Sequence, residues 1–99
     1  MKHVLYGVSG AAMARVGEIV SSALSVELAQ RESDYLGVYL NGVIGSAKVR
    51  IVVQPDPEGE LLEPDFPEWD ILVYLDGPDE LPALDKLKFK GGIIKILRE

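Results

Sequence analysis

The spacing of apolar residues changes along the chain, and each spacing predicts a different element. Between Ala11 and Leu24, apolar side chains recur every three to four positions, as they do on one face of an amphipathic helix. In most other segments, apolar and polar side chains alternate or the apolar residues form short runs, which is typical of strands. The predicted strands cover residues 3–8, 26–32, 35–40, 46–54, 70–75 and 93–97.

Local signals place the turns and the helix ends. Ser9 stands where its hydroxyl can cap the first helix, and Asn41-Gly42 favours a tight hairpin turn. The segment Gly77-Pro78-Asp79-Glu80 opens a second predicted helix, which runs to the lysines before Gly91. The inner side of this helix is expected to carry Leu81, Leu84 and Leu87.

The resulting order of elements is β-α-β-β-β-β-α-β within a single domain, residues 1–99. It predicts the α+β class, as a two-layer sandwich with a largely antiparallel sheet of about five to six strands and two helices on one face. This is a variant of the ferredoxin-like arrangement. The first strand, the first helix and the next strand are expected to form a right-handed crossover. Residues 55–68 hold four of the six prolines and are predicted to form a long loop.

Charge is distributed unevenly along the sequence. The formal net charge is −6, but residues 51–85 contain eleven acidic residues and no lysine or arginine, which gives this segment a charge of −11. The rest of the chain carries +5. A separation of charge of this size steers a basic partner toward one region of the surface.

Composition excludes several classes of site. The chain has no cysteine and a single histidine, His3, so we expect no disulfide, zinc or thiol chemistry and no other metal or cofactor. Gly7-Val8-Ser9 matches the start of the Gly-x-Ser-x-Gly pattern of a nucleophile elbow, but Ala11 stands in place of its last glycine. The acids from Asp56 to Glu60 have the spacing of a calcium loop without its glycine and final glutamate. We therefore predict that the protein is not an enzyme. No apolar run approaches the ~20 residues of a membrane span, which favours a cytoplasmic protein without a membrane partner.

Nucleic-acid binding is a weaker alternative. Tyr35, Tyr39 and Tyr74 are candidates to share an open sheet face with Lys48 and Arg50. The aromatic RNA-binding strand motif is absent, however, and the acidic segment repels phosphate. We expect no nucleic-acid partner. The tyrosine face remains an alternative surface for binding a protein.

The strongest candidate for a binding surface is the acidic loop. Phe66 and Trp69 lie among its acids and are braced by Pro64 and Pro67, and such aromatics often anchor interfaces. Either aromatic can instead belong to the core. The predicted partner-binding residues are Asp56, Glu58, Glu60, Glu63, Asp65, Phe66, Glu68 and Trp69.

Three runs carry a family resemblance: Leu24–Leu28, Arg31–Gly37 and Glu63–Trp69, the last before a Leu-Val-Tyr strand. In these runs and in its organisation the chain resembles small uncharacterised bacterial proteins encoded beside polymorphic toxins, the suspected immunity proteins of those systems. The resemblance implies a non-catalytic inhibitor that blocks a cognate toxin with a basic surface. An alternative is a small ligand-binding or oligomerising regulatory domain of ferredoxin-like shape. We expect a monomer or a weak dimer.

Overall fold

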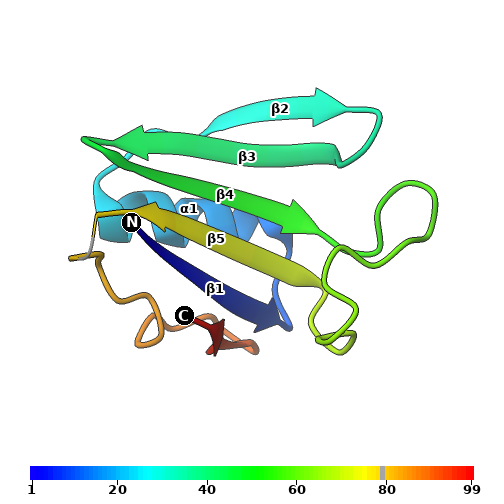
Figure 1. Ribbon diagram of the computed structural model, residues 1–99. Helices are drawn as coiled ribbons and strands as arrows, with labels where there is room; N and C mark the ends of the chain where they lie inside the picture. Colours follow the sequence, from blue (N-terminus) through cyan, green and yellow to red (C-terminus); the bar gives the residue numbers. More distant parts are fainter. Residues whose placement is uncertain (79) are drawn as a thin grey trace.

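One antiparallel sheet and one helix make up the regular structure of the described residues, 1–78 and 80–99, in the computed structural model (Figure 1). The elements are β1 (Lys2–Ser9), α1 (Met13–Leu24), β2 (Ala29–Ser33), β3 (Gly37–Ile44), β4 (Ala47–Val53), β5 (Ile71–Gly77) and β6 (Ile93–Arg98). The α+β class and the antiparallel sheet of six strands confirm the sequence prediction.

The strand order is β2-β3-β4-β5-β1-β6, and every neighbouring pair is antiparallel. β2 to β5 form a continuous meander, and β1 then inserts between β5 and β6. The predicted β-α-β crossover is present in a split form: α1 connects β1 to β2, which run parallel because four antiparallel pairings lie between them, with three strands in between. Val4–Val8 are buried at five consecutive positions, so β1 requires strand partners on both edges and cover on both faces.

The predicted second helix is wrong. Residues 80–92 follow an irregular path, while Asp79 lies outside the described residues. Pro82 lacks the N–H that a helix interior needs, and its ring disfavours the helical conformation of Leu81. The segment nevertheless buries Leu84 and Phe89 against the same sheet face as α1, and the Leu84 backbone N–H donates to the Tyr6 hydroxyl at 3.2 Å. Burial therefore organises this segment without helical hydrogen bonding.

Helix α1 confirms the first predicted helix and covers one sheet face through Val16, Val20 and Leu24. Gly17 allows the close approach, since a Cβ at this position would lie 2.5 Å from Leu40 Cδ1. The predicted cap at Ser9 is wrong: Ser9 ends β1, and Ala12 is the cap residue without a side-chain hydrogen bond.

The turn between β3 and β4 lies at Gly45-Ser46, not at Asn41-Gly42 as predicted. Asn41 and Gly42 are paired strand residues, because β3 continues to Ile44, which faces Ala47 across the hairpin. Strand pairing with β4 outweighs the local turn preference of the Asn-Gly pair.

The two faces of the sheet carry separate apolar clusters. On the helix face, α1 and the 80–92 segment cover the alternate residues of the central strands. On the opposite face, which we call the loop face, a second cluster contains Leu5, Val52, Leu72 and Trp69. Trp69 comes from the segment 54–70 between β4 and β5, which extends past the ends of both strands (Figure 1). We call this segment the acidic loop.

Candidate functional site

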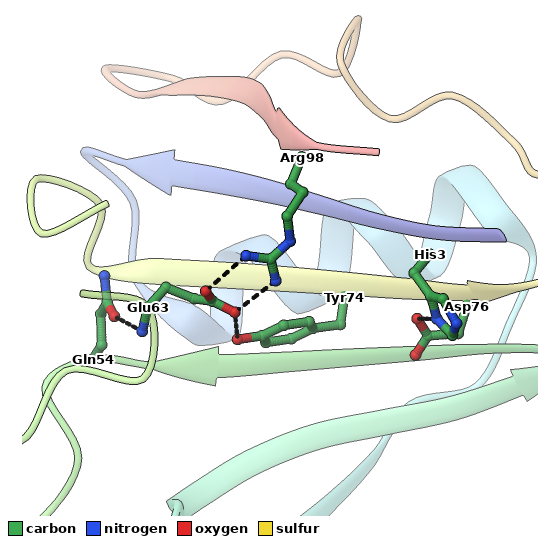
Figure 2. Close-up of polar contacts among 6 residues, drawn as sticks. All are labelled: His3, Gln54, Glu63, Tyr74, Asp76 and Arg98. Carbon is green, nitrogen blue, oxygen red and sulfur yellow. Dashed lines mark hydrogen bonds and ion pairs between the residues drawn. The ribbon is translucent and has the colours of Figure 1, made fainter. Parts of the chain in front are cut away.

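Gln54 fixes the acidic loop from inside. Its side chain is only 2% exposed, and its amide nitrogen donates to the backbone oxygens of Phe66 at 2.8 Å and Trp69 at 2.6 Å. Its amide oxygen accepts the backbone N–H of Glu63 at 3.0 Å (Figure 2). One buried amide thus holds three positions of the loop, and breaking these bonds would leave buried polar groups without partners.

Asp56 shapes the tip of the loop. Its carboxylate oxygen accepts the backbone N–H groups of Glu58 and Glu60, both at 2.9 Å, and the residue is only 9% exposed. Aspartate commonly stabilises a turn in this way. The carboxylate of Asp56, predicted as a partner-binding residue, is therefore bonded to the backbone of its own loop.

Glu63 ties the loop to the last strand. The Arg98 guanidinium donates two hydrogen bonds to its carboxylate, at 2.9 and 3.0 Å, and the Tyr74 hydroxyl donates a third at 2.9 Å (Figure 2). The hydrogen bonds from Arg98 lower the pKa of Glu63 against the opposing effect of burial, and Tyr74 lowers it further. Burial, followed by the nearby Glu63 carboxylate, raises the pKa of Tyr74. Glu63 is thus the negative end of a structural ion pair.

The two aromatics of the loop lie against the sheet. Trp69 is 8% exposed, and its ring occupies the space above Gly7, where an added Cβ would be 2.6 Å from two ring atoms. Phe66 is partly buried against the same cluster. The sequence allowed Trp69 to be either a surface anchor or a core residue, and in the structure it is a core residue.

Four of the predicted acids are exposed on the fixed loop. They are Glu58, Glu60, Asp65 and Glu68, which we call the acidic rim. Within residues 1–78 and 80–99, none of these four carboxylates forms an ion pair. The structure thus divides the eight predicted residues into an exposed charged set and a set that supports the loop.

The acidic loop leaves part of the loop face uncovered. This part, which we call the open half, carries basic and aromatic residues. Lys48 and Arg50 alternate along β4, and the Arg50 guanidinium lies 5.2 Å from the centre of the Tyr74 ring across the β4–β5 pair. Tyr35 reaches the same region from the β2–β3 turn and lines a pocket of about 200 Å³ with Arg50 and Tyr74. The sharing of this face by the tyrosines, Lys48 and Arg50 agrees with the alternation in the sequence.

A histidine–aspartate pair also lies on the open half. His3 Nδ1 is 2.6 Å from a carboxylate oxygen of Asp76, its partner across the β1–β5 pair (Figure 2). This pair is not predictable from local sequence patterns, because 73 residues separate its members. The available signal was the polar position 76 in an otherwise apolar strand, which only the strand register connects to His3.

In the described part of the chain, no three His, Cys, Asp or Glu side chains are placed to hold a metal ion together. The same part contains no helix with the length and hydropathy needed to cross a membrane. Comparisons with protein-family models, with curated proteins and with solved structures find no match to this chain.

Proposed function

We propose that this protein is a non-catalytic, cytoplasmic inhibitor of the immunity type, which binds a basic partner protein through the acidic rim. The observation that carries the proposal is the exposure of Glu58, Glu60, Asp65 and Glu68 on a loop whose base is fixed by buried contacts. The partner expected for such an inhibitor is a cognate toxin with a cationic surface.

A fixed loop favours binding because little conformational freedom is lost when the partner docks. Gln54 and Asp56 hold the backbone, and Trp69 holds the end of the loop on the sheet. The exposed carboxylates are therefore presented by an ordered surface. Their field accelerates encounter with a basic protein, and this acceleration decreases with salt.

The residues have different roles in the proposed interface. The acidic rim supplies steering, and Phe66, partly buried at the margin of the loop, supplies apolar contact. Asp56, Glu63 and Trp69 act indirectly, because their side chains hold the loop in place. Substitutions at these three positions are consequently poor tests of direct contact.

The test uses the purified product of the gene next to this one, which the proposal expects to be a toxin. Association rates are measured against this protein at increasing salt, for the wild type, Glu58→Gln/Glu60→Gln and Asp65→Asn/Glu68→Gln. The matched control is Glu27→Gln/Glu32→Gln, which removes the same charge from two exposed acids outside the loop. Both rim variants should slow association severalfold at low salt, and the difference should shrink once screening acts within ~10 Å.

Two results would contradict the proposal. Equal slowing by the control pair would show that only net charge matters, and unchanged rates in both rim variants would place the interface elsewhere. A neighbouring gene product that does not bind the wild-type protein would contradict the inhibitor role itself.

A further inference from the structure

The open half of the loop face carries two exposed cations, Lys48 and Arg50, and one nearby acid, Asp76. Asp76 is the residue opposite Lys48 across the β4–β5 pair, and its carboxylate hydrogen-bonds His3 rather than Lys48, so the two cations exceed the acid in number. Within the described residues, neither Lys48 nor Arg50 forms an ion pair, and both are exposed. An exposed face of this kind attracts a negatively charged surface.

Apolar side chains border these two cations. Val43, which pairs with Lys48, is 63% exposed, and Tyr35 is 70% exposed. A pocket of about 220 Å³ on this face is lined by Lys48 and Arg50 together with Val43 and Asp76. The open half thus combines charge with apolar area, as the surfaces of weak protein interfaces do.

The acidic loop stands on the same face, at the opposite end of the strands. Figure 2 shows the Gln54–Glu63 contact near one end of β5 and the His3–Asp76 pair near the other. The loop tip also lies on this face, because a Cβ at Gly37 would be 3.1 Å from Pro57. The loop face is therefore a step, with a raised acidic end and a lower basic end.

We infer that the loop face binds a second copy of this chain, turned end for end, so that the acidic loop of each copy lies over Lys48 and Arg50 of the other. A two-fold axis makes both contacts equivalent, as in most homodimers. Charge complementarity selects this occupant, since one molecule presents both halves of the match.

This dimer is weak and sensitive to salt. Exposed ion pairs contribute little individually, and screening reduces them further. The dimer covers the acidic rim, so a basic partner and a second copy compete for the same carboxylates. The inference does not require the proposed inhibitor role, because self-association is measured without any partner.

Sedimentation of the purified full chain over a concentration series tests the inference by a charge exchange. One variant reverses the basic end, Lys48→Glu/Arg50→Glu, and another reverses the rim, Glu58→Lys/Glu60→Lys. Each variant alone should be monomeric where the wild type dimerises at low salt. An equimolar mixture should regain the dimer, because each contact again joins opposite charges. Lys86→Glu/Lys88→Glu, at two exposed lysines in the 80–92 segment, is the control and should dimerise like the wild type.

Three outcomes would overturn the inference: a wild type that stays monomeric at low salt and high concentration, a reversed variant that still dimerises, or a mixture that stays monomeric. Circular dichroism verifies that each variant folds. If a reversed pair does not fold, the neutral pairs Lys48→Gln/Arg50→Gln and Glu58→Gln/Glu60→Gln replace it. Each neutral pair should weaken the dimer severalfold, and an unchanged dimer would again overturn the inference.

Discussion

The two faces of the sheet are covered in different ways. On the helix face, α1 packs a regular row of apolar side chains onto the strands, and Leu84 and Phe89 complete the cover. On the loop face, an irregular segment covers only half of the surface, through Trp69 and a few specific polar contacts. One face of the sheet is thus covered by a regular row of helix side chains, and the other by a few individual residues of the acidic loop.

This difference indicates where the protein is sensitive to single changes. On the helix face, the burial is divided among many side chains of α1, β1, β4 and β5. The acidic loop has fewer attachments, and each of them positions several others, as Gln54 does for Phe66 and Trp69. The position of the exposed acids therefore depends on buried residues such as Gln54 and Trp69.

Removing the Trp69 side chain should have the largest effect on the loop face. Trp69→Ala leaves a cavity above Gly7, and such truncations cost roughly 3–5 kcal/mol of unfolding free energy. Chemical denaturation followed by circular dichroism measures the loss. Hydrogen exchange should also accelerate in the acidic loop before it does in α1, because the loop loses its main apolar attachment.

The control for this change is Phe66→Ala, which removes a ring that is only partly buried and should cost less. If Trp69→Ala changed the unfolding free energy by less than about 1 kcal/mol, Trp69 would not be the main attachment of the loop.

Two glycines compare the faces directly. A Cβ at Gly7 would lie 2.6 Å from the Trp69 ring, which is buried and cannot rotate away, so Gly7→Ala should cost about 1–3 kcal/mol. At Gly17 the obstacle is the terminal methyl of Leu40, which can move, and alanine favours the helix by about 1 kcal/mol. The net change for Gly17→Ala should stay within about 1 kcal/mol. Thermal unfolding of both variants gives the order, and a larger loss at Gly17 would reverse the comparison.

A small effect, comparable in size to that at Gly17, is expected at Glu63, where it should depend on pH. Its pKa in the folded state lies below the ordinary value of 4.5, so its stabilising contribution is complete above that pH and disappears as the pH falls through the lowered value. Glu63→Gln should cost about 1 kcal/mol at neutral pH, since Arg98 is half exposed and screened. The wild-type and variant stabilities should converge in acid. Glu68→Gln, at an exposed acid, is the control, and a constant difference at all pH values would contradict the assigned ion pair.

The regular elements were largely predictable because their signals are local. Period-two alternation identified β4 and β5, and the helical spacing identified α1. The failures occurred where tertiary contacts outweigh local preference. Asn41-Gly42 is absorbed into β3 by pairing with β4, and residues 80–92 bury their leucines without forming a helix.

The negative charge of the candidate site was predictable from the sequence. Which of its acids are exposed and which hold the loop in place was not. The uninterrupted run of acids indicated the loop, and four of those acids are exposed as a steering surface requires. Nothing in the sequence distinguishes Glu63 from Glu68, although one is bonded to Arg98 and the other faces solvent. Arg98 lies 35 residues from Glu63, so their contact exists only once β6 pairs with β1.

The sequence by itself determined the periodic elements, the charge separation and the absence of thiol chemistry, because these depend on neighbouring residues or on composition alone. The tertiary structure decided the order of the strands, the burial of Trp69 and the meeting of His3 with Asp76. It also placed the acidic loop and the basic end of the sheet on one face. These features depend on strand register between distant segments, and a shift of one residue in register would turn each side chain to the opposite face.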